Sequence, residues 1–155
     1  MSRMLEMFFD DLRVGQTETT RRRTITETDV TMWCMFTGDW FPLHSDKIYA
    51  EQSRFGQRVA PGWMVMALAG GLCVPAETQT VIANYGTERV RYPNPAFIGD
   101  TVHVVATIET LKERDKQTGL VDVRWDVTNQ NDKIVCSIII RIMVKQRAAD
   151  ADAGG

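Results

Sequence analysis

Asp39 and His44 are the residues of this sequence best suited to proton transfer, and only the residues 40–43 separate them. A carboxylate and an imidazole held in an apolar segment can share one water molecule and move protons to and from it. The same pattern fits a structural role, in which Asp39 ends a helical turn and His44 is a hydrogen-bonded loop residue. The spacing alone leaves both interpretations open.

The pair is predicted to follow a short helix over residues 30–36. Thr26 and Asp29 have the spacing of a capping box before this helix, and Gly38 suits its C-terminal end. Residues 38–44 are therefore predicted to form a loop that carries both chemical groups.

A longer helix is predicted from Gly62 to Val74, because this run contains no polar side chain. A helix that is apolar on every side has to be buried on every side, so other elements must wrap around it. Period-two alternation supplies candidates, since it is typical of half-buried antiparallel strands. Strands are predicted at 17–26, 81–92, 102–109, 121–128 and 134–145.

These elements predict an α+β architecture in which a curled antiparallel sheet wraps around one long hydrophobic helix, an arrangement known as the hot-dog fold. A helix of about 13 residues spans roughly 20 Å, which matches a strand of about six residues. Residues 1–146 are predicted to form this single domain. Residues 147–155 are small and polar, and we expect a disordered tail.

The composition argues against several classes of protein. The 155 residues include 18 basic and 20 acidic side chains, a net charge of −2 that gives no general attraction to nucleic acid or an anionic membrane. The longest apolar stretch is shorter than the roughly 20 residues needed to cross a bilayer. The three cysteines are scattered and lack zinc-site spacing, and the N-terminus has no signal-peptide pattern, so we expect a cytoplasmic protein without a bound metal.

The segment Phe36–Asp46, with the sequence Phe-Thr-Gly-Asp-Trp-Phe-Pro-Leu-His-Ser-Asp, resembles the signature of the MaoC-like (R)-specific enoyl-CoA hydratases and dehydratases. That family has Gly-Asp-x-Asn-Pro-x-His followed shortly by an acidic residue. The resemblance covers about residues 8–145, with further blocks at 54–56, 59–62, 86–93 and 99–100. It implies a hot-dog fold and a homodimer or a higher homo-oligomer.

The resemblance implies that Asp39 and His44 are the catalytic pair. They would hold and activate the water that adds across the C2–C3 double bond of an enoyl-CoA thioester, or act in the reverse dehydration. Which of the two takes the proton from water stays open, because coupled groups share their titration. No cofactor is implied other than the coenzyme A of the substrate.

Gly62 is the third candidate, as part of an oxyanion site. Its amide lies in the first turn of the predicted helix, where backbone donors are free, and a thioester carbonyl can approach a residue without a side chain. A fixed donor there stabilises the charge that builds on this oxygen in an enolate-like transition state. In the simpler alternative, Pro61 and Gly62 merely begin the helix.

Two residues depart from the family pattern: Phe41 replaces the usual asparagine, and Pro61 replaces a common histidine. Trp40, Phe41 and Trp63 are predicted to give the substrate site a bulky apolar lining. Ordinary packing in the core or between subunits would use the same side chains.

Arginines are the candidate contacts for the phosphates of coenzyme A. They are Arg54, Arg58, Arg89 and Arg91, together with the cluster at 21–23. Arginines on exposed strand faces also protect sheet edges from pairing, which is the structural alternative.

Two other functions fit the same residues. A hot-dog thioesterase would direct water to C1 of an acyl-CoA thioester in place of C3. A non-catalytic module would bind acyl-CoA without cooperation between the carboxylate and the imidazole.

Overall fold

The computed structural model describes residues 4–147, so residues 148–155 of the predicted tail at 147–155 lie outside the described residues. Arg147, the first residue of that tail, is held by an ion pair with Asp11. The short helical turns are η1 (Met4–Glu6) and η2 (Phe9–Asp11), the helices are α1 (Glu27–Thr37), α2 (Pro42–Ser45), α3 (Lys47–Glu51) and α4 (Gly62–Cys73), and the strands are β1 (Thr17–Thr19), β2 (Arg23–Thr24), β3 (Val81–Arg91), β4 (Thr101–Glu113), β5 (Thr118–Thr128) and β6 (Ile134–Lys145).

The strands form one antiparallel sheet in the order β1-β4-β5-β6-β3, and β2 also pairs with β4. The predicted alternation is confirmed on β4 and β5, where buried and half-buried residues follow each other. The inward side chains pack into the core, and they include Val102, Val104, Ala106, Ile108, Val121, Val123, Trp125 and Val127. β3 lies at one edge of the sheet.

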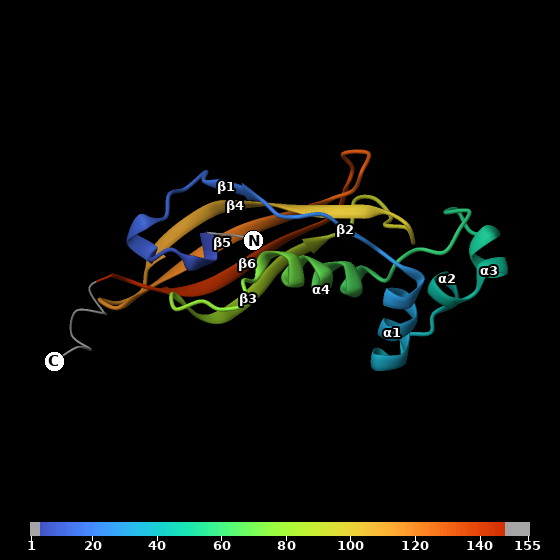
Figure 1. Ribbon diagram of the computed structural model, residues 1–155, viewed down its shortest axis with the longest axis horizontal. Helices are drawn as coiled ribbons and strands as arrows, with labels where there is room; N and C mark the ends of the chain where they lie inside the picture. Colours follow the sequence, from blue (N-terminus) through green and yellow to red (C-terminus); the bar gives the residue numbers. More distant parts are fainter. Residues whose placement is uncertain (1–3, 148–155) are drawn as a thin grey trace.

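Helix α4 packs against the curved sheet, as the hot-dog prediction requires (Figure 1). Its buried side is formed by Met64, Val65, Ala69, Leu72 and Cys73. The prediction of burial on every side is wrong, because Trp63, Ala67 and Gly71 are exposed along one stripe of the helix. One sheet covers one side of a helix, and nothing in residues 4–147 covers the other.

Helices α1, α2 and α3 lie beyond one end of the strands, near the first turn of α4 (Figure 1). We call this segment, residues 27–51, the overhang. The predicted capping box at the start of α1 is confirmed: the Asp29 amide donates to Thr26 Oγ1, and the Thr26 amide donates to the Asp29 carboxylate at 2.8 Å. Gly38 ends the helix with φ of 77°.

The prediction that 38–44 is entirely a loop is wrong at its end, where His44 lies in the short helix α2. Pro42 begins that helix, and its fixed φ suits a first helical turn. Asp46 then ends α2 and caps α3, accepting from the amides of Ile48 and Tyr49. The His44 imidazole is therefore carried by a short, regular helix.

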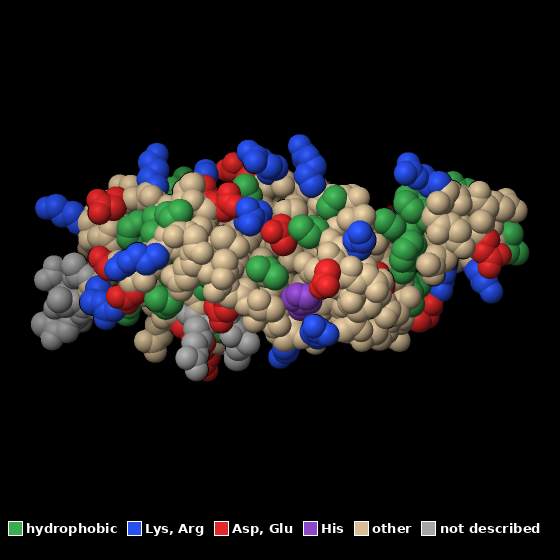
Figure 2. Space-filling view, turned by 90° about the horizontal axis from the view of Figure 1, so that it is seen from above, with side chains coloured by type: hydrophobic (Ala, Val, Ile, Leu, Met, Phe, Trp, Pro, Cys, Tyr) green, Lys and Arg blue, Asp and Glu red, His purple; other side chains and the backbone are tan. Residues whose placement is uncertain are grey.

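The remaining predictions concern burial and membranes. Cys34, Cys73 and Cys136 are buried and free, as expected of core cysteines, and burial raises the pKa of the Cys73 and Cys136 thiols to about 12. No helix in the described part of the chain is both long and apolar enough to cross a membrane. Figure 2 shows basic and acidic side chains intermixed over one face of the molecule.

Candidate active site

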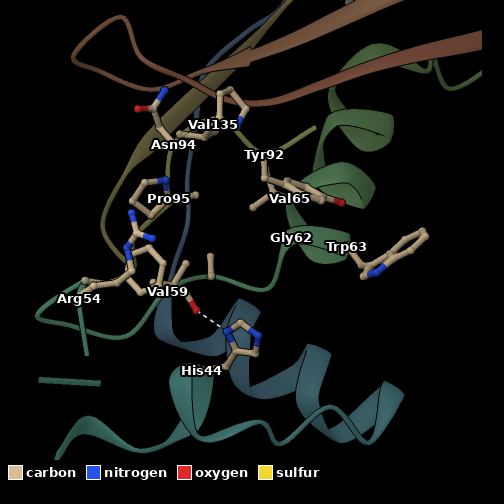
Figure 3. Close-up of a pocket in the computed structure, with 14 residues that line it drawn as sticks. His44, Arg54, Val59, Gly62, Trp63, Val65, Tyr92, Asn94, Pro95 and Val135 are labelled. Atoms are coloured by element: carbon tan, nitrogen blue, oxygen red, sulfur yellow. Dashed lines mark hydrogen bonds between the residues drawn. The ribbon is translucent and has the colours of Figure 1, made fainter. Parts of the chain in front are cut away.

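A cavity of about 450 Å³ lies where the overhang meets the first turn of α4 (Figure 3). We call it the α4 cavity. Its walls come from α2, from the chain that leads into α4, and from the turn after β3. The lining residues are His44, Arg54, Phe55, Val59, Ala60, Gly62, Trp63, Val65, Tyr92, Pro93, Asn94, Pro95, Ala96 and Val135.

His44 lines the α4 cavity, and its ring is fixed from one side. The Nδ1 atom lies 2.7 Å from the carbonyl oxygen of Val59. A carbonyl oxygen only accepts hydrogen bonds, so Nδ1 must carry the proton in this contact and the neutral ring leaves a lone pair on Nε2. The Phe41 ring packs edge-on against the imidazole at 5.8 Å between centroids.

Asp39, the other member of the predicted pair, lies on a different segment from His44. It follows Gly38 at the end of α1 and is half-buried, but it does not line the α4 cavity. Within residues 4–147 its carboxylate accepts no hydrogen bond, from His44 or from any other group. Burial and the negative charge of Asp39 together raise the pKa of the Cys34 thiol, which places this charge beside α1.

Gly62 is the first residue of α4, and no side chain caps the helix there. The first hydrogen bond of the helix is donated by the Val65 amide to the Pro61 carbonyl, which leaves the preceding amides available. A Cβ atom at Gly62 would lie 2.8 Å from Cζ of Tyr92 and 2.9 Å from its Cε1. A side chain at this position would therefore collide with the tyrosine ring.

Of the three aromatic residues predicted to line the substrate site, only Trp63 lines the α4 cavity. Trp63 lines the α4 cavity and is 64% exposed. Trp40 and Phe41 do not line it, although both are about half exposed. Phe41 packs between His44 and Tyr49, so its contact with the site is through the imidazole.

Of the four arginines predicted to bind phosphate, one lines the α4 cavity and three do not. Arg54 lines the α4 cavity, stacks over Phe55 at 5.6 Å, and forms no ion pair within residues 4–147. Arg58 is paired with Glu27 and lies outside this cavity. Arg89 and Arg91 belong to β3 and are not part of the lining.

Tyr92 and Asn94 line the site and were not singled out by the sequence. Asn94 is fixed, since its side-chain amide donates to the Ile134 carbonyl at 2.8 Å. The proximity of Tyr92 to Gly62 joins residues far apart in the chain, and no sequence pattern marks it. In the described part of the chain, no group of three or more His, Cys, Asp or Glu side chains is placed to hold a metal ion.

The sheet wrapped on α4 and the cavity at the start of that helix define a hot-dog protein. A family model described as MaoC like domain matches residues 12–131. The chain therefore belongs to the MaoC-like dehydratase family.

Named relatives agree with this assignment. The chain is 42% identical over 100 residues to Protein MaoC of Klebsiella aerogenes and 32% identical over 148 residues to the β-methylmalyl-CoA dehydratase of Chloroflexus aurantiacus. These alignments cover 64% and 94% of this chain but only 30% and 42% of those proteins. The chain thus spans less than half the length of these two relatives.

A relative of similar length is the (R)-specific enoyl-CoA hydratase of Rhodospirillum rubrum, 27% identical over 91% of this chain and 88% of that protein. The crystal structure of the MaoC-like dehydratase from Rhodospirillum rubrum superposes with a TM-score of 0.81 at 27% identity, covering 91% of this chain and 98% of that one. The fold is therefore shared along nearly the full length of a solved structure.

The geometry of His44 makes a direct prediction. In the neutral imidazole, ¹⁵N NMR is expected to show a protonated Nδ1 and an unprotonated Nε2, because the Val59 carbonyl requires a donor. The chain has two histidines, so the His103→Ala variant assigns the signals. A neutral ring protonated on Nε2 would contradict this geometry.

Proposed function

We propose that this chain catalyses the (R)-specific hydration of trans-2-enoyl-CoA thioesters, or the reverse dehydration of 3-hydroxyacyl-CoA. The observation that carries this proposal is the fixed His44 ring on the wall of a cavity that also contains the uncapped start of α4. The relatives named as CoA dehydratases and as an (R)-specific hydratase support the same class of reaction.

In the proposed hydration, water adds its oxygen to C3, one of its protons leaves, and C2 receives a proton. In this proposal His44 holds the water from the cavity wall, and Asp39, which lies outside the cavity lining, is its partner in carrying these protons. His44 Nε2 is the ring nitrogen left for water because Val59 occupies Nδ1. Negative charge moves onto the thioester oxygen as C3 is attacked. The Gly62 amide stabilises that charge, so the reaction needs neither a metal nor a redox cofactor.

The first test is an assay of hydration with crotonyl-CoA and longer enoyl-CoA thioesters, in which the loss of the enoyl absorbance measures the rate. Asp39→Asn and His44→Ala are each expected to lower kcat/KM by about 10²-fold or more, the usual contribution of a positioned acid or base. His103→Ala, on strand β4 outside the cavity, is the matched control and should keep the wild-type rate.

Full activity in the Asp39 and His44 variants, or an inactive wild type across the panel, would contradict the hydratase proposal. Release of free thiol from acyl-CoA would favour the thioesterase alternative. Tight acyl-CoA binding without turnover, unchanged in His44→Ala, would favour a non-catalytic binding module.

Arg54 is the predicted phosphate contact that the α4 cavity supports, because its guanidinium lies in the lining without an ion-pair partner in residues 4–147. Arg54→Ala is expected to raise KM for an enoyl-CoA about tenfold, the loss of one charge-assisted contact. KM for the enoyl N-acetylcysteamine thioester, which lacks the phosphates, should not change.

Arg91→Ala is the matched control for Arg54, since Arg91 is exposed on β3 and its guanidinium donates to the neighbouring Val90 carbonyl. An equal change of KM for both thioesters would show that Arg54 contacts another part of the substrate.

We also propose that the chain forms a homodimer. Met32, Met35 and Phe36 on α1 are 64%, 70% and 88% exposed, and the outer edge of β3 is unpaired within the described residues. Large apolar side chains gathered in this way are typical of protein interfaces.

The cytoplasmic location expected from the sequence stays a prediction.

Sedimentation at micromolar concentration is expected to give about twice the mass of one chain, and Phe36→Asp should shift the protein to monomer by placing a charge in the interface. Val14→Asp is the control, because Val14 is 63% exposed and lies in the segment between η2 and β1. The first described residues of the chain lie far from α1 in the molecule (Figure 1). A wild-type monomer would overturn the dimer proposal.

A further inference from the structure

Tyr92 occupies a defined place at the start of α4. It follows the last residue of β3 and precedes Pro93, so the strand and the proline restrict the backbone on either side. Its ring lies across Gly62, and the carbon that carries the hydroxyl, Cζ, is 2.8 Å from the position of a Gly62 Cβ. The ring can occupy this place because Gly62 has no side chain.

This contact puts the phenolic hydroxyl at the same end of α4 as the free amides. The Cα–Cβ direction of a helical residue tilts toward the N-terminus of the helix, which is also the direction of its unpaired N–H groups. Tyr92 and Gly62 both line the α4 cavity, and Figure 3 shows the tyrosine ring above Gly62 on the side of Trp63.

The hydroxyl of Tyr92 is available as a donor. It makes no hydrogen bond to any group in residues 4–147, and the residue is 43% exposed at the cavity. A phenol is protonated at neutral pH, and burial raises the pKa of Tyr92 further above its ordinary value. A protonated phenol beside a bound carbonyl oxygen donates a hydrogen bond to it.

We propose that the Tyr92 hydroxyl is a second hydrogen-bond donor to the thioester carbonyl oxygen, acting together with the Gly62 amide. This inference rests on the proposed function, because it assigns the donor pair to the oxygen that gains charge during hydration. Two donors fixed before the reaction stabilise that charge more than mobile water does. Tyr92 is then a catalytic residue that contacts the substrate, in addition to Asp39 and His44.

The test is the Tyr92→Phe variant, which removes the hydroxyl and keeps the ring that packs on Gly62. For crotonyl-CoA we expect kcat to fall about 10²-fold, the loss measured when one oxyanion donor is removed, with little change in KM or in thermal stability. Tyr85→Phe is the matched control, because Tyr85 lies on β3, outside the cavity lining, under Arg114. An unchanged kcat in Tyr92→Phe would overturn the proposal.

A second measurement separates this proposal from the hydratase proposal. Butyryl-CoA labelled with ¹³C at the thioester carbonyl cannot be hydrated, and its bound carbonyl stretch reports the donors directly. Wild type and Tyr85→Phe should move the stretch to lower frequency, and Tyr92→Phe should lose part of that shift.

The two measurements together distinguish failure of the Tyr92 proposal from failure of the hydratase proposal. A shift that depends on Tyr92 in a protein that hydrates no enoyl-CoA would reject the hydratase proposal and retain the donor. Equal shifts in wild type and Tyr92→Phe, or no binding of butyryl-CoA by wild type, would reject the donor.

Discussion

The packing of α4 against the sheet sets the position of the groups in the candidate site. Strands β4, β5 and β6 all contact this helix, and its buried side chains anchor it over most of its length. The first turn of the helix, with its free amides, consequently lies at one end of the sheet. The overhang and the turn after β3 reach that same end, and the α4 cavity forms between them. Chemistry at the site therefore depends on a hydrophobic contact that contains no catalytic residue.

The start of α4 has a second constraint, which is the lack of space at Gly62. A glycine there was expected from the need to admit a substrate carbonyl. The structure adds an internal reason, because the Tyr92 ring already occupies the volume of a side chain. The two reasons are compatible, since the ring covers one side of the residue and the amide points along the helix axis. Any substitution at Gly62 would displace the ring and disturb both proposed donors together, so such a variant could not separate their roles.

Local patterns predicted the parts of the fold that depend on local physics. The alternation on β4 and β5, the capping box at Thr26 and the end of α1 at Gly38 follow from periodicity and backbone geometry. The predicted burial of α4 on every side is wrong for a physical reason. An apolar helix surface indicates that contact with other apolar groups is favourable, but it does not indicate that the same chain provides those groups. The choice of Arg54 over Arg58 depends on Glu27, which neutralises Arg58 from another element. Such long-range pairings carry no signal in a single sequence.

The distribution of donors and acceptors across the α4 cavity supports the proposed hydration over hydrolysis of the thioester. Donors at the start of α4 would stabilise a thioester oxygen in hydration and in hydrolysis alike, so they do not distinguish the two. The distinction lies in where water is held. In the proposed reaction His44 holds it, because the Val59 carbonyl fixes the ring and leaves Nε2 as the acceptor. An acceptor fixed on a wall separate from the donors suits attack at a carbon conjugated to the carbonyl, because charge created at one end of the substrate is then stabilised at the other.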